Sequence, residues 1–234
     1  MPKIQRYISN ELTHFVGRGK VPDEQYSLLV QILRSGWLTH PPHNPNISGN
    51  LSINTTERLS ANKMYSPQVV CFCDIPIEDL HIHTSKYSCF GFSLSKEFVA
   101  QQGGAPVFYV PLNTNIRWSR NEEVFLGELF DRNIPKFHEL IFQIIKTQRA
   151  PHDLQQHLDL LQFLEFRLMS FVKFFDNNLP DDDPNNFYME REWRVVGNIH
   201  FSLEDVMRIC IPQDYKKRFG TDFPDFSGQV TFID

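Results

Sequence analysis

The chain has 234 residues, of which 41% are hydrophobic and 22% are charged, and this composition excludes a disordered or fibrous protein. Its net charge of −5 excludes a chain that binds nucleic acid through overall charge, so any such contact would need a local basic patch. The chain has too few cysteines for a disulfide framework, no apolar stretch that spans a bilayer, and no apolar signal core in MPKIQRYISNEL. We therefore expect a cytoplasmic protein with reduced thiols and no membrane partner.

The first elements are a strand and a helix. LTHFV at residues 12–16 predicts a strand that ends at the following GRGK turn. Pro22 opens a predicted helix with apolar residues at helical spacing, Gly36 lies where a C-cap glycine belongs, and a short strand follows. Residues 40–68 are polar and rich in Asn, Pro and Ser, which predicts a long loop with a short helix around residues 56–64.

The middle of the chain alternates strands and short helices. VVCFC at residues 69–73 predicts a buried strand, and residues 77–84 predict a helical turn. Further strands are predicted at residues 87–93 and 106–111, on either side of a short helix that Gly103 and Gly104 end.

The last part of the chain is helical and then returns to strands. Residues 121–175 predict helices broken near Pro135 and Pro151, with a broad apolar face. Strands are predicted at residues 193–197 and 207–212, a helix at 213–219 and an edge strand at 229–233. We predict one α+β domain over residues 1–234, with a mixed or antiparallel sheet and a mostly helical insertion at residues 121–178.

Several residue patterns suggest chemistry, and each also has a purely structural interpretation. Cys71-x-Cys73 with His81-x-His83 offers zinc ligands, but the spacing is unusual and cysteine in an apolar strand commonly packs as a small hydrophobe. The same interpretation is favoured over a nucleophilic cysteine, because no glycine elbow surrounds any thiol. The GRGK turn is a weak phosphate-cradle signal and is interpreted as an exposed turn. We predict no metal site.

Two glutamates form the most interesting pair. In MEREWRVVG, Glu190 and Glu192 are two residues apart, so on a strand they would face the same way. Such carboxylates can stabilise the oxocarbenium ion that forms when a glycosidic bond breaks. The structural alternative is that they pair with Arg191 and Arg194 on the surface. On spacing alone this alternative is favoured.

Five phrases together carry a resemblance. They are LTHFVGR, LLVQILRSGWL, VCFCDIPIEDLHIHTSKYSCFGFSLSKEF, GGAPVFYV and EREWRVVG. The chain resembles the abortive-infection AbiGi-type family of bacterial phage-defence proteins, over roughly residues 7–110 and 187–212. The block from CFCDIP to GFSLSKEF is the specific part of the match.

A looser similarity concerns the layout of ADP-ribosyltransferase-like toxins. A first strand with a histidine, a helix that ends in ILRSGWL and a late strand with Glu-x-Glu are similar to that layout. The resemblance implies that His14 holds NAD, that Tyr87 supports the nicotinamide and that Glu192, with Glu190 as its companion, drives loss of nicotinamide. The residues that it places around the cofactor are His14, Phe15, Arg18, Asp74, His83 and Tyr87. SKYSCFGFS around Tyr87 departs from the standard motif.

Three functions follow from these patterns. The first is a phage-defence effector that cleaves NAD and transfers ADP-ribose to a macromolecule, either nucleic acid or protein. The second is a non-catalytic antitoxin or sensor that binds a partner protein, with the helical segment at residues 135–176 as its surface. The third is a nuclease in which Asp74, Glu190 and Glu192 hold magnesium. It ranks last because no metal-nuclease spacing is present.

Overall fold

The computed structural model describes residues 9–40, 44–46, 50–147, 151–180, 183 and 185–233. The chain divides into two compact units, each with a hydrophobic core of its own. Unit 1 comprises Met1–Ser48, Val69–Pro106 and Glu190–Asp234, and unit 2 comprises Gly49–Gln68 and Val107–Met189. The segment predicted as a helical insertion, residues 121–178, lies within unit 2.

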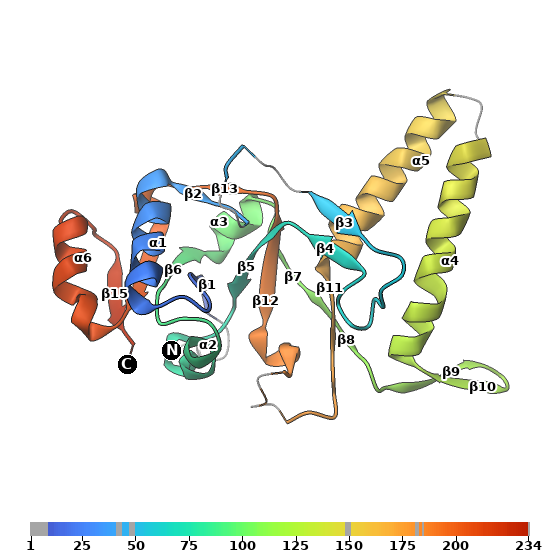
Figure 1. Ribbon diagram of the computed structural model, residues 1–234, viewed down its shortest axis with the longest axis horizontal. Helices are drawn as coiled ribbons and strands as arrows, with labels where there is room; N and C mark the ends of the chain where they lie inside the picture. Colours follow the sequence, from blue (N-terminus) through green and yellow to red (C-terminus); the bar gives the residue numbers. More distant parts are fainter. Residues whose placement is uncertain are drawn as a thin grey trace, which may run out of the picture. The chain divides into compact units, whose positions relative to one another are not determined.

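Unit 1 is built on a mixed seven-stranded sheet (Figure 1). In spatial order its strands are β15 (Gln229–Phe232), β14 (Val206–Ile211), β6 (Gly91–Ser95), β1 (Glu11–Phe15), β5 (Val69–Cys73), β12 (Glu192–Val196) and β7 (Ala105–Pro106). Only the pair β14 and β15 is parallel among the described ladders of this sheet. The sheet and its helices confirm the α+β class, and β15 is the predicted edge strand.

The first helix follows the capping signals of the sequence. Helix α1 runs over Pro22–Ser35, with acidic residues in its first turn. Gly36 ends it in the left-handed region at φ 65°, and its N–H donates to the carbonyl of Ile32. Strand β2 (Trp37–Leu38) follows and pairs with β13 (Ile199–His200). The predicted helix, its glycine cap and the short strand are thus confirmed.

Short helices connect the other strands of unit 1: η1 (Ile77–Asp79), α2 (His81–Lys86), α3 (Lys96–Gln101), η5 (Leu203–Asp205), η6 (Gln213–Tyr215) and α6 (Lys216–Asp222). The strand predicted for residues 87–93 was placed too early. Tyr87 instead ends α2, because the Ser88 hydroxyl accepts from the N–H of Phe90 and holds a turn, so β6 begins only at Gly91.

Unit 2 combines three strand pairs with two long helices. Strands β3 (Leu51–Ile53) and β4 (Tyr65–Pro67) form a hairpin, as do β9 (Asn115–Ser119) and β10 (Glu122–Phe125), whereas β8 (Phe108–Pro111) and β11 (Val172–Phe175) are parallel. Helix α4 covers Leu126–Thr147 and α5 covers Pro151–Phe163. A π-helix, η2 (Leu164–Leu168), and a 3-10 turn, η3 (Met169–Phe171), continue from α5, and a last turn, η4 (Phe187–Glu190), leads to Arg191.

Several predictions for unit 2 were wrong in detail. Residues 51–67 form a hairpin rather than only a loop, and no helix forms around residues 56–64, where the Asn54 side chain accepts from the N–H of Thr56 instead. The predicted strand at residues 106–111 is two strands, β7 and β8. Pro135 lies inside α4 without breaking it, and packing of the buried Leu129, His138 and Ile141 supports the helix on both sides of the proline in sequence. No helix of the described residues has both the length and the hydropathy to cross a membrane.

Candidate functional site

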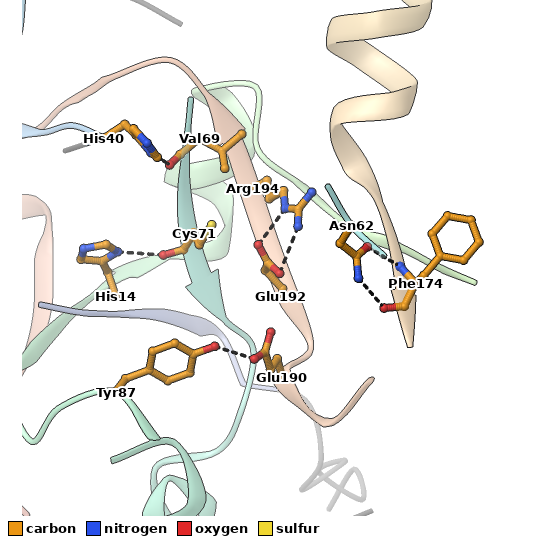
Figure 2. A network of polar contacts seen from close by, with 10 residues as sticks. All are labelled: His14, His40, Asn62, Val69, Cys71, Tyr87, Phe174, Glu190, Glu192 and Arg194. Atoms are coloured by element: carbon orange, nitrogen blue, oxygen red, sulfur yellow. Dashed lines mark hydrogen bonds and ion pairs between the residues drawn. The ribbon is translucent and has the colours of Figure 1, made fainter. Parts of the chain in front are cut away.

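The Glu190 carboxylate is the centre of a buried polar cluster in unit 1. It accepts from the Tyr87 hydroxyl at 2.5 Å (Figure 2). It also accepts from the ammonium of Lys86 at 2.5 Å, and the residue is only 4% exposed. Burial and the charge of Glu190 raise the pKa of Tyr87 far above its usual value, and the nearby charge of Glu192 adds to this effect. Tyr87 is therefore a neutral hydrogen-bond donor at physiological pH.

Asp74 directly follows β5 and is also buried. Its Oδ2 atom lies 2.7 Å from Nζ of Lys96, at the start of α3, and 3.9 Å from the guanidinium of Arg191. The N–H of Asp74 donates to the carbonyl of Arg191, which has a positive φ of 44°. Because Arg191 adopts a left-handed conformation between η4 and β12, Glu190 belongs to η4 and not to the strand.

Glu192 is the first residue of β12. It is 6% exposed, and the guanidinium of Arg194 donates to its two carboxylate oxygens at 2.7 and 3.4 Å. In the sheet it lies opposite Cys73, which in turn lies opposite Thr13 of β1. Glu192 therefore shares a face of the sheet with these two residues.

His14 lies on β1, one residue beyond the Thr13–Cys73 pair. Its half-buried ring contacts the rings of Phe72 and Phe92, and Nδ1 lies 2.7 Å from the carbonyl oxygen of Cys71 (Figure 2). Because successive side chains alternate along a strand, His14 belongs to the opposite face from Thr13 and Glu192. The imidazole thus bridges β1 and β5 beyond their one paired position.

The other predicted cofactor residues fall into two groups. The guanidinium of Arg18 lies 5.1 Å from the centre of the Tyr87 ring, and His83 stacks on that ring at 6.1 Å. Phe15 instead packs with the buried residues Cys73 and Cys210. The structure therefore brings Arg18 and His83 to the Tyr87 ring and Tyr87 to Glu190, but it packs Phe15 against the core.

The predicted glutamate pair is thus more buried and less symmetrical than its spacing suggested. Glu190 is not on the strand, and its described ion-pair partner is Lys86 rather than Arg191. Glu192 does pair with Arg194, but inside the protein rather than on the surface. Lys86, which pairs with Glu190, and Lys96, which pairs with Asp74, were not predicted as partners, although both lie within the quoted block from CFCDIP to GFSLSKEF.

Neither a metal ion nor a cysteine nucleophile is supported in the described part of the chain. No group of three or more His, Cys, Asp or Glu side chains there could hold a metal, and the His81 side chain lies outside the described residues. Burial raises the pKa of the Cys210 thiol to about 12 and that of Cys73 further, so both stay protonated. The zinc, magnesium and nucleophile interpretations therefore gain no support.

Unit 1 also has a cavity of about 340 Å³ between α1 and α6. Its lining includes Arg34 and Arg218, which are paired with Asp222 at 2.8 Å and Asp23 at 2.9 Å. Because each guanidinium already has a carboxylate partner, the cavity offers an anion little uncompensated charge.

A different feature dominates unit 2. Large apolar side chains are exposed along both helices and at the end of the π-helix, and we call these residues the helical patch: Leu140, Phe142, Ile144, Leu158, Leu160, Phe163 and Leu168. The apolar face predicted within residues 121–175 is therefore only partly internal. Phe171 and Phe174 are buried, whereas Leu158 and Phe163 face solvent.

A family model described as "Putative abortive phage resistance protein AbiGi, antitoxin" matches residues 46–219. The chain belongs to the AbiGi family. This confirms the resemblance to AbiGi-type proteins, and membership implies a role in abortive phage resistance. Neither the comparison with curated proteins nor that with solved structures finds a match. The similarity to ADP-ribosyltransferases stays a prediction.

Proposed function

We propose that this AbiGi protein is the antitoxin of a phage-defence pair and that it binds and neutralises its toxin protein through the helical patch. The observation that carries the proposal is the exposure of seven large apolar side chains on α4, α5 and η2. Large apolar side chains that are exposed on one segment are typical of interaction sites, because exposed apolar surface costs free energy in water. The family description, which names an antitoxin, indicates a protein partner.

The arrangement of the patch indicates what the partner offers. Leu140 and Ile144 are four residues apart on α4, and Leu160 and Phe163 are three apart on α5, so each pair lies on one side of its helix. Such stripes fit an apolar groove or an amphipathic helix on the toxin. Because the residues of the helical patch are 36–59% exposed, burying the rest of each side chain would contribute roughly 0.75–1.5 kcal/mol before the costs of association.

The test pairs one patch residue with a matched control. Leu158 in the patch and Met207 in unit 1 are both 40% exposed. Leu158→Lys is expected to weaken toxin binding at least tenfold, because it places a charge in an apolar interface, whereas Met207→Lys leaves binding unchanged. Binding is measured with the co-expressed toxin by calorimetry, and neutralisation by growth of the host cells. Equal binding by both variants would contradict the proposed surface.

A second candidate rests on the buried acids of unit 1. Here the protein would have an ADP-ribosyltransferase-like fold and cleave NAD, with transfer of ADP-ribose to nucleic acid or protein. His14 would hold NAD, Tyr87 would support the nicotinamide, and Glu192 would stabilise the oxocarbenium ion as the bond to nicotinamide breaks. The observation in its favour is that Glu190, Glu192 and Tyr87 influence one another electrostatically within one unit. Against it, His14 and Glu192 belong to opposite faces of the sheet.

Release of nicotinamide from labelled NAD decides this candidate. The ADP-ribosyltransferase hypothesis predicts that the purified protein releases nicotinamide and that Glu192→Gln lowers the rate of release by about 10²–10³. Glu204→Gln, at an exposed position of unit 1, is the matched control. No release by a folded wild-type protein would exclude it.

A further inference from the structure

Three polar side chains from three elements of unit 2 meet inside its core. The Tyr65 hydroxyl, from β4, forms a short hydrogen bond with Nε2 of His138, from α4. On the other side of the imidazole, Nδ1 of His138 lies 3.8 Å from a carboxylate oxygen of Glu165 in the π-helix η2. His138 is only 2% exposed, and we call these three residues the relay.

The relay has one favoured arrangement of protons. The carboxylate of Glu165 favours the tautomer of His138 that carries its proton on Nδ1. Nε2 is then an acceptor, so the Tyr65 hydroxyl donates to it. Burial lowers the pKa of His138, which keeps the imidazole neutral and able to accept.

The relay also lies where the helical hairpin is anchored. A π-helix is rare and often accompanies a functional site, and the one here carries Glu165, whose carbonyl accepts from the Ser170 hydroxyl at 2.8 Å. A second tie fixes α4 to the same part of the chain as β4. The N–H and hydroxyl of Ser60 donate to the carboxylate of Asp131 at 2.9 and 2.6 Å.

We propose that the relay of Tyr65, His138 and Glu165 sets the position of α4 and α5 in unit 2, and thereby whether the helical patch is presented to the toxin. The inference rests on the proposed antitoxin function. His138 is a positioning residue: it contacts β4 and the π-helix but belongs to the helix that carries Leu140, Phe142 and Ile144. The relay is closed when Tyr65 and His138 are hydrogen-bonded and open when this bond is broken. In the open relay, α4 is held less firmly against β4.

The two titrating members have opposite pH signatures. Burial lowers the pKa of His138 below 6.5, so the opened relay binds a proton more readily and the closed relay loses stability as the pH falls through about 6.5. Burial raises the pKa of Glu165 above 4.5, so the closed relay loses stability as the pH rises through that raised value. Among the described residues, Tyr65 and Glu165 are the titratable groups that face His138, and its ring neighbours Phe137 and Phe142 carry no charge.

Hydrogen exchange of the full chain tests the relay without the toxin. Tyr65→Phe removes only the hydroxyl and is expected to raise amide exchange in α4 by about threefold to tenfold, with unit 1 unchanged. In Glu165→Gln, opening of α4 is expected to increase as the pH falls through 6.5, after correction for intrinsic exchange, and Glu165→Gln with His138→Gln loses this dependence. The inference would be overturned if the amides of α4 exchange at the same rate in Tyr65→Phe as in the wild type. It would also be overturned if the pH dependence persists after His138 is replaced.

Toxin binding then separates this inference from the function on which it rests. The relay predicts that Tyr65→Phe weakens toxin binding although Tyr65 is itself buried. If α4 loosens but toxin binding is unchanged, the positioning role is wrong and the helical patch stands. If wild-type protein does not bind the toxin, the proposed function fails, and the exchange and pH profile still decide whether the relay positions α4.

Discussion

At the scale of single residues, the left-handed backbone of Arg191, with a φ of 44°, determines the surroundings of Glu190. The spacing in EREWR favours pairs of both glutamates with the neighbouring arginines on the surface. The turn at Arg191 instead directs Glu190 toward Lys86 and Tyr87. These partners are more than 100 positions away in the chain, and no local pattern carries that contact.

Glu190 is expected to contribute strongly to stability. Glu190→Gln removes the carboxylate that pairs with Lys86, whose side chain is 11% exposed, and breaking a buried ion pair by removing one partner costs roughly 3–5 kcal/mol. The free energy of unfolding from urea titration measures the loss. The exposed Glu204→Gln is expected to stay within about 0.5 kcal/mol of wild type. Similar values for the two variants would show that the Lys86 pair is not maintained in solution.

The cysteines are expected to differ in reactivity. Cys71 is exposed, whereas burial raises the pKa of Cys73 and Cys210, the latter to about 12, so little thiolate forms at pH 8. Mass spectrometry after alkylation of the folded protein should find Cys71 modified first. Cys73 and Cys210 should react only after denaturation. Rapid labelling of Cys210 under native conditions would contradict its place in the core.

At the scale of elements, prediction succeeded where local chemistry decides the structure. Helix α1 begins at a proline, carries acids in its first turn and ends at a glycine, and all three signals are local. Prediction from the sequence failed where tertiary contacts decide the local structure. The turn segment between β3 and β4 is held by Asn62, whose side chain bonds both backbone groups of Phe174, 112 positions away. Composition alone made this segment look like a plain loop.

Two glycines give a matched test at this scale. Gly36 has a φ of 65°, and an added Cβ would lie 2.6 Å from the carbonyl oxygen of Phe201. Gly36→Ala is therefore expected to destabilise the fold by roughly 1–3 kcal/mol. Gly220 lies inside α6 with no atom within 4 Å of an added Cβ, so Gly220→Ala is expected to stabilise by about 0.5–1 kcal/mol. Urea unfolding measures both, and the same sign for both variants would contradict the cap.

At the scale of the whole molecule, the α+β class and the strand that returns to the sheet edge followed from the order of the predicted elements. The division of the chain did not, because each unit is assembled from separated segments. Residues 49–68 join unit 2 through packing of Leu59, Met64 and Tyr65 with Phe174, and these contacts leave no periodic signal. The exposure of the helical patch could not be predicted either, since the sequence pattern of an apolar helix face is the same whether the face is buried or exposed.

Hydrogen exchange of the protein, alone and in complex with the toxin, decides whether unit 2 presents the helical patch to a toxin. Binding at the patch predicts that amides of α4, α5 and η2 gain protection in the complex, while the strands of unit 1 change little. Protection confined to unit 1, with α4 and α5 exchanging as in the free protein, would contradict it.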